Sequence, residues 1–280
     1  MEALLFPITN VYSATLLPVL AACLVPSSLP SSELLLGFCA QGLLPCAAFY
    51  ACSLFFCLLD TCSGRAWLAA HKFQGAAGLV APGSYPAAWA VSLRSWLVGL
   101  CYVLVLCKLG PALGQPLASS PWSPWEPLLH FPLFLLAVDA CFFCTHRLLH
   151  QPLLFRAVHS FHHSFSAPFA VASVYAHPFE HLFSNVLSIS LGPVLLCSHP
   201  LTAGLWGALT AFSTCNAHSG FRFALTSEGH DWHHRDAREM FGAGLALLDK
   251  GLGTNKRFLA HLAAQRNGEG GCCRKAESKE

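Results

Sequence analysis

Four long apolar runs occupy the first half of the chain. A helix that crosses a bilayer needs about 20 predominantly apolar residues, and these runs meet or nearly meet that length: residues 4–25, 34–59, 87–109 and 128 to about 144. The segments between them are rich in proline, glycine and serine, which is typical of connections. Hydrophobic residues make up 54% of the chain and charged residues only 11%, whereas about 25% of a soluble globular chain is charged. The first half therefore predicts membrane-spanning helices.

Two shorter apolar runs follow at 182–197 and 201–215, joined by the tripeptide SHP. Each is marginal for crossing a bilayer alone, so we expect a hairpin that dips into the membrane or packs on the other helices. The predicted fold class is an all-α integral membrane protein. It has about four transmembrane helices plus a short membrane hairpin, with a cytosolic, histidine-rich helical cap.

The basic residues predict the orientation in the membrane. Of the 16 Lys and Arg residues, 12 follow residue 144, and Arg65 and Lys72 lie in the connection at 60–86. Basic residues favour the cytosolic side, so four crossings place both termini, this connection and the chain from residue 146 onward in the cytosol, apart from the hairpin. The formal net charge is only +2, which provides no strongly basic surface for nucleic acid.

Histidine is the unusual residue of the second half. Eight of the 15 histidines fall in three short boxes: HRLLH at 146–150, HSFHH at 159–163 and HDWHH at 230–234. In a helix, residues i and i+4 lie on one face, so His146 and His150 can approach one metal ion from the same side. In each HxxHH box the first histidine shares a face with the other two, while the adjacent pair diverges by about 100°. Such a box can give two ligands to one ion and turn the third toward another, which predicts a two-metal site.

The boxes alone do not choose the metal, because imidazole binds Zn, Cu, Fe and Ni. A ligating ring is neutral, and its other nitrogen usually needs a hydrogen-bond acceptor. The carboxylates near the boxes are candidate acceptors: Asp139, Glu180, Asp231 and Asp236. Asp139 lies two helical turns before His146 on the same face, which predicts that it supports that ring. Isolated histidines are expected to be structural or solvated: His71, His130, His199 and His261.

Three further motifs accompany the boxes: APFAVASVYAHPFEHLFSN at 167–185, NAHSGF at 216–221 and LDKGLGT at 248–254. Together they resemble the fatty acid hydroxylase superfamily, or sterol desaturase family, which includes C4-methylsterol oxidases and cholesterol 25-hydroxylases. The resemblance covers about residues 128–256. It divides the chain into N-terminal transmembrane helices at 1–127, a fatty acid hydroxylase-like di-metal domain at 128–256 and a flexible cytosolic tail at 257–280.

The resemblance implies a non-haem di-metal centre, normally di-iron, that uses O2 to oxidise an unactivated C–H bond. Carried over residue by residue, it implies ten metal ligands: His146, His150, His159, His162, His163, His177, His218, His230, His233 and His234. His181 matches only the nearest branch of the family, so we expect it beside the ligands rather than among them. No catalytic residue separate from the metal site is expected.

These inferences predict a membrane-bound di-iron oxygenase that hydroxylates or oxidises a sterol or fatty acyl chain in lipid or sterol biosynthesis, with zinc able to replace iron. The sequence contains no dinucleotide-binding fingerprint. By resemblance, the electrons come from cytochrome b5 and its NADH-dependent reductase. We expect a multi-pass protein of the endoplasmic reticulum membrane with its histidine boxes in the cytosol.

Three other interpretations remain open. A membrane metal transporter would place ionisable residues within its spans, whereas here Arg94, Lys108 and Asp139 are the main examples. A zinc-dependent membrane hydrolase would use a carboxylate base near an open metal position, such as Asp231 or Glu180. A catalytically silent relative would act as a scaffold, and it would keep its cellular effect when its metal ligands are replaced.

Overall fold

Three helical units in the described part of the chain are long and apolar enough to cross a membrane. The computed structural model describes residues 23, 28–223 and 227–267, and the units are Ser31–Cys62, Ser84–Leu113 and Glu126–Leu149. They match the spans predicted at 34–59, 87–109 and 128–144, and the span predicted at 4–25 lies almost wholly outside the described residues. The described chain forms no strand, only an isolated bridge between Lys72 and Phe221. The predicted all-α membrane fold is confirmed.

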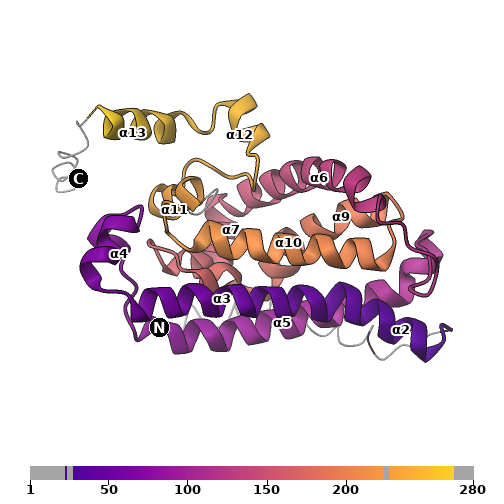
Figure 1. Ribbon diagram of the computed structural model, residues 1–280. Coiled ribbons are helices and arrows are strands. Elements are labelled where there is room, and N and C mark those ends of the chain that lie inside the picture. Colours follow the sequence, from indigo (N-terminus) through magenta and orange to yellow (C-terminus); the bar gives the residue numbers. More distant parts are fainter. Residues whose placement is uncertain (1–22, 24–27, 224–226, 268–280) are drawn as a thin grey trace.

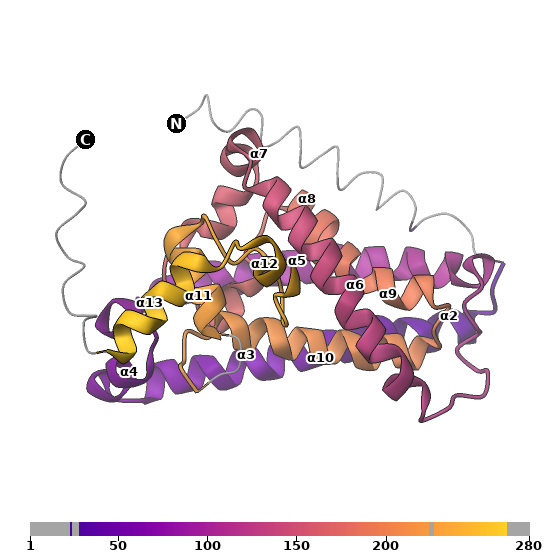
Figure 2. The same cartoon turned by 90° about the horizontal axis from the view of Figure 1, so that it is seen from above.

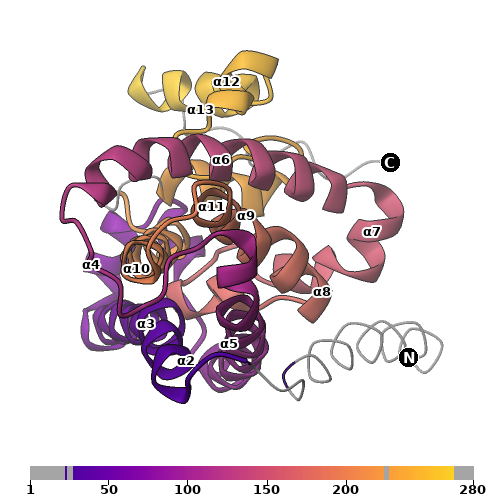
Figure 3. The same cartoon turned by 90° about the vertical axis from the view of Figure 1, so that its right-hand side faces the viewer.

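The long helices form a bundle (Figures 1 and 3). The first unit comprises α2 (Ser31–Phe38), a π-helical turn η1 (Cys39–Leu43) and α3 (Leu44–Cys62), and α5 (Ser84–Leu109) lies beside it. α10 (Pro200–His218) packs along α3, and α6 (Glu126–Leu149) covers the other side. α9 (Leu187–Leu195) contacts both α6 and α10.

The hairpin expected at 182–197 and 201–215 is built from the π-helical turn η6 (His181–Val186), α9 and α10. The chain reverses at the SHP tripeptide, where the ring of His199 caps α10: its Nδ1 accepts a hydrogen bond from the Leu201 amide at 3.1 Å. Pro200 occupies the first turn, where a missing N–H costs nothing. His199 is thus structural, as its isolation in the sequence predicted.

α10 approaches the first helical unit closely because it carries glycine at the contact. A Cβ atom at Gly204 would overlap the carbonyl oxygen of Ala40. Small residues at helix contacts let backbones come together in membrane proteins. This approach fixes the height of α10, and therefore of His218 at its end, relative to α3.

An apolar cluster fills the space between α3, α5 and α10. It includes Phe49 and Phe56 of α3, Phe221 after α10, and all but one residue of the buried segment η5 (Ala170–Val174). Complete burial of one phenylalanine stabilises the fold by roughly 1.5–3 kcal/mol. The cluster therefore supports the histidine-bearing segments that surround it.

Short elements gather around the end of the bundle where α6 and α10 finish (Figure 2). They are α4 (Arg65–His71), η2 (Gly75–Gly78), α7 (Pro152–Ala157), η4 (His159–Ser164), α8 (Pro178–Glu180), α11 (Ser227–Asp236), α12 (Leu247–Leu252) and α13 (Lys256–Arg266). α13 corrects one expectation, because the predicted flexible tail at 257–280 begins as a helix. Phe258 and Leu262 lie one turn apart on α13 and pack in a cluster with Trp232, which holds α13 against α11.

Candidate metal centre

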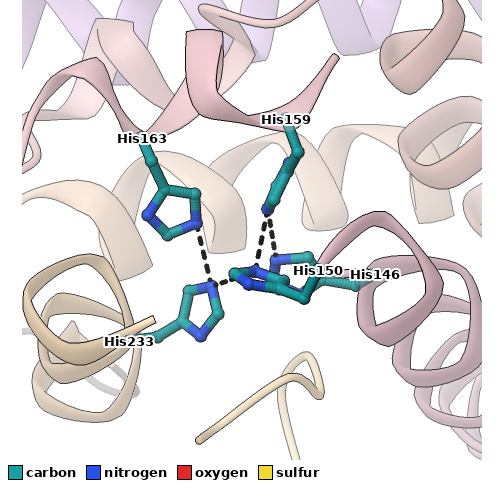
Figure 4. Close-up of side chains that lie close together, drawn as sticks. All are labelled: His146, His150, His159, His163 and His233. Carbon is teal, nitrogen blue, oxygen red and sulfur yellow. Dashed lines mark hydrogen bonds between the residues drawn. The ribbon is translucent and has the colours of Figure 1, made fainter. Parts of the chain in front are cut away.

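Five histidines converge on one point at the end of α6 (Figure 4). This first histidine group consists of His146, His150, His159, His163 and His233, and one ring nitrogen from each lies within 4.8 Å of the others. The Nε2 atom of His159 lies 3.1 Å from that of His146 and 3.0 Å from that of His150. The Nε2 atom of His233 lies 3.1 Å from those of His150 and His163.

Four more histidines form a second group: His162, His218, His230 and His234. The Nε2 atom of His218 lies 3.4 Å from that of His162 and 2.9 Å from that of His230. The rings of His162 and His163 belong to different groups, and their centroids are 5.7 Å apart. The two groups are therefore neighbours.

Each HxxHH box is divided between the groups, in the way its spacing predicts. The box on η4 gives His159 and His163 to the first group and His162 to the second. The box on α11 gives His233 to the first group and His230 with His234 to the second. Adjacent histidines thus face different centres in both boxes.

Backbone carbonyls fix the protonation of five of these rings. The Nδ1 atom of each lies within hydrogen-bond distance of a carbonyl oxygen: His146 to Phe241 at 2.8 Å, His233 to Glu239 at 2.7 Å, His162 to Tyr175 at 3.3 Å, His218 to Thr214 at 2.9 Å and His234 to Phe165 at 3.1 Å. A carbonyl only accepts, so Nδ1 carries the proton and the Nε2 atom of a neutral ring presents a lone pair. His162 and His218 therefore turn two lone pairs toward each other, and a cation between them would remove the repulsion.

The surroundings keep the rings neutral. Burial lowers the pKa of His150 and His162 to about 4. It also lowers the pKa of His230, His233 and His234 well below the ordinary value, and neighbouring histidines add to the effect. Neutral imidazole is the form that ligates a metal, so the low pKa values of these rings are compatible with metal binding at neutral pH.

The spacing of the Nε2 atoms fits metal coordination. Ligands about 2.1 Å from an ion and at right angles to each other lie about 3 Å apart. The four Nε2 separations in the first group are 3.0–3.1 Å, which suits an ion of high coordination number. Imidazole donors suit Fe, Zn, Cu and Ni, so the donor set fits iron.

The motif at 177–181 contributes one supporting carboxyl group. The Glu180 side chain is buried, and its Oε1 lies 2.9 Å from Nδ1 of His159. Burial raises the pKa of Glu180 well above its ordinary value. The structure brings His177 into neither group: it is buried, and its Nδ1 accepts a hydrogen bond from the Phe179 amide. His181 lies beside α5, close to Gly99, and also outside both groups.

The other predicted supporting carboxylates make different contacts. Asp139 does not support His146: its two oxygens accept the Leu247 and Leu248 amides at 3.1 Å and cap α12. Since helix N-termini leave amides unpaired, a buried carboxylate satisfies them well. Asp231 accepts a hydrogen bond from Gln74, and Asp236 pairs with Arg238 and Arg257.

Sequence patterns do not indicate most of the residues that hold the ligand-bearing segments. Asp249 accepts hydrogen bonds from the Phe241 and Gly242 amides, and so positions the Phe241 carbonyl that faces His146. Lys72 is buried, and its ammonium donates a hydrogen bond to the Ser219 carbonyl next to His218. The motif LDKGLGT contains Asp249 and could have indicated the contacts of this residue. No sequence pattern indicated the contact between Lys72 and Ser219.

A cavity of about 690 Å³ runs between α5, α6, α9 and α10 and reaches the second histidine group. Its wall includes Trp96, Val103, Leu106 and Leu135, and it is mainly apolar. Of the nine grouped histidines, only His218 and His230 line it. The second group therefore borders a space suited to an apolar ligand.

The comparisons with known proteins agree with this architecture. The family model described as "Fatty acid hydroxylase" matches residues 131–254. The chain is 31% identical over 234 residues to "Fatty acid hydroxylase domain-containing protein 2" of Macaca fascicularis, covering 81% of this chain and 69% of that protein.

Two other relatives have names that describe different reactions. "Methylsterol monooxygenase 2-2" of Arabidopsis thaliana is 31% identical, covering 54% of this chain and 62% of that protein. "Very-long-chain aldehyde decarbonylase GL1-11" of Oryza sativa subsp. indica is 37% identical, covering 50% and 58%. The chain thus spans less than two thirds of these two relatives. No solved structure matches.

Proposed function

The chain belongs to the fatty acid hydroxylase family, and on that premise we propose that it is a membrane-bound, non-haem di-iron oxygenase. Its proposed reaction is the hydroxylation or oxidation of a C–H bond in a sterol or fatty acyl chain with O2, in lipid or sterol biosynthesis. The observation that supports it best is the convergence of nine histidine rings in two adjacent groups. In five of these rings Nδ1 carries the proton and donates to a backbone carbonyl, so the unprotonated Nε2 faces the other rings of its group.

Each group would hold one iron ion, which zinc can replace. Bound iron would supply the redox chemistry that lets O2 attack an unactivated C–H bond. A hydroxylation consumes O2, two electrons and two protons, and it yields the alcohol and one water. The chain's own residues hold the ions, exclude water and position the target carbon.

The cavity favours a lipid substrate. Its apolar wall of Trp96, Val103, Leu106 and Leu135 can hold a hydrocarbon, and His218 and His230 also line it. We therefore place the target carbon beside the second histidine group, with the first group behind it. We propose that the lipid enters this space from the bilayer.

Electrons would reach the centre from the cytosolic side. The sequence carries no dinucleotide-binding fingerprint, so a separate donor is proposed, namely cytochrome b5 with its NADH-dependent reductase. We place the protein in the endoplasmic reticulum membrane, with the histidine groups facing the cytosol, as part of this proposal. The basic residues concentrated after residue 144 support that orientation.

The proposal is tested by profiling sterols and fatty acids in cells that express wild type or His233→Ala. Wild type should change a lipid's abundance, and His233→Ala should abolish the change. His130→Ala is the matched control, because His130 lies on α6 sixteen residues before His146, about 24 Å away along the helix axis. Identical profiles for wild type and His233→Ala would contradict the oxygenase proposal, and a cellular effect kept by His233→Ala would favour the scaffold.

A further inference from the structure

A short segment of the N-terminal half pairs with the chain that follows His218. This 71–74 segment consists of His71, Lys72, Phe73 and Gln74. The Phe73 amide donates to the Gly220 carbonyl at 2.8 Å, and the Arg222 amide donates to the His71 carbonyl at 2.9 Å. Gly220 has a φ of +72°, which turns the chain sharply out of α10 so that this pairing can form.

The Lys72 side chain fastens the same turn from within. It is 1% exposed, and its ammonium donates to the Ser219 carbonyl at 2.6 Å. Its charge is balanced by Asp60 of α3, 2.7 Å away, and Tyr85 of α5 donates to the other Asp60 oxygen at 3.0 Å. A buried charge is tolerated only when it is paired and hydrogen-bonded in this way. The pair therefore ties Ser219, and His218 before it, to two long helices.

The Gln74 side chain joins two other histidine-bearing segments. Its amide nitrogen donates to the Ser166 carbonyl and to Oδ1 of Asp231, both at 2.7 Å. Ser166 lies four residues after His162, and Asp231 directly follows His230. One side chain thus fixes the distance between η4 and α11.

The contacts of Lys72 and Gln74 converge on the second histidine group. Together they reach the segments that carry all four of its members, and two of these segments, η4 and α11, also carry His159, His163 and His233 of the first group. The hydrogen bonds of Lys72 and Gln74 named here do not involve α6. That helix carries His146 and is followed directly by His150, both of the first group. The 71–74 segment also lies outside residues 131–254, the part that matches the family model.

We propose that Lys72 and Gln74 are positioning residues that set the geometry of the second histidine group and hence its affinity for metal. The inference rests on the proposed two-metal function. Partners that orient ligands without touching the metal typically change metal affinity by about 10–100-fold. Here the larger effect should fall on the second group, because all four of its histidines lie on the contacted segments, whereas His146 and His150 of the first group lie on α6 or directly after it.

The test uses Co²⁺ alone, titrated into metal-free, full-length protein in detergent and followed by visible absorption and metal content. His150→Ala and His218→Ala assign the absorption bands to the first and second groups. Two variants then remove the contacts: Gln74→Leu, at a half-buried position, and the double variant Asp60→Asn/Lys72→Met, which removes the buried pair without leaving one charge alone. Lys108→Met is the control, because Lys108 also donates to a backbone carbonyl, that of Cys23, but near the far end of α5.

We expect Gln74→Leu and the double variant to weaken Co²⁺ binding to the second group about 10–100-fold, with a smaller loss at the first group, while the Lys108→Met variant binds as wild type does. Unchanged second-group affinity in both variants would overturn the inference, and so would an equal loss at both groups. A wild-type protein that takes up fewer than two ions would instead contradict the proposed function.

Discussion

The Nε2 atoms of His150 and His233 lie 3.1 Å apart, although 83 positions separate the two residues in the chain. The ring of His233 is fixed from behind by the Glu239 carbonyl, and His150 follows the last turn of α6. Both rings are neutral, His233 being buried and His150 partly buried, and their Nε2 atoms are close enough to bind one ion. The contact joins the end of α6 to α11.

Removing one ligand should affect only the ion of its own group. We predict that purified His150→Ala loses the first-group ion and His218→Ala loses the second-group ion, since each group has its own ligand set. Metal content after anaerobic, iron-replete preparation checks this. Loss of both ions in both variants would show that the groups do not bind independently.

The metal-free protein should lose stability in acid. Folding lowers the pKa of His150 and His162 from 6.5 to about 4, so below pH 6.5 the unfolded chain takes up protons that the folded chain does not. The free energy of unfolding should therefore fall as the pH drops from 6.5 toward 4, and stay level just above 6.5 as far as these groups are concerned. Thermal unfolding in detergent across this range measures it, and a stability that rises toward pH 4 would contradict the assignment of neutral rings.

Glu180 should strengthen the first group through His159. Replacing it with leucine removes the oxygen 2.9 Å from Nδ1 of that ring, and we predict about 10–100-fold weaker binding of the first-group ion. Glu180→Gln keeps an acceptor oxygen and should lose much less. Equal affinities in Glu180→Leu and wild type would exclude this role.

The sequence predicts the elements better than it predicts their contacts. Apolar length located the three described spans, because a membrane segment must bury its own backbone hydrogen bonds whatever its neighbours are. The box spacing predicted the division of His162 and His163 between two centres, because that depends only on local rotation. By contrast, the hydrogen bonds of Asp139 to the start of α12 and of Gln74 to Asp231 join segments that meet only in the folded protein.

The same limit explains the two remaining differences. α13 forms where a tail was expected because Phe258 packs beside Trp232, a tertiary contact. His177 matches the family's pattern, yet it caps α8 in the structure, and its assignment as a ligand stays a prediction.

Filling the cavity should stop turnover without removing metal. Val103 lines the cavity on α5, so Val103→Trp should abolish the lipid change while both ions remain bound. Leu97→Trp is the matched control, because Leu97 lies on the same helix and is 56% exposed. Normal lipid oxidation by Val103→Trp would show that the substrate lies elsewhere.

The central claim is that the histidine segments meet around two metal ions. Anomalous diffraction from crystals of the iron-loaded protein, measured on both sides of the iron absorption edge, tests this most directly. The account predicts two iron peaks, one within His146, His150, His159, His163 and His233 and one within His162, His218, His230 and His234. A map with no iron peak at either group, or with these rings turned away from one another, would contradict it.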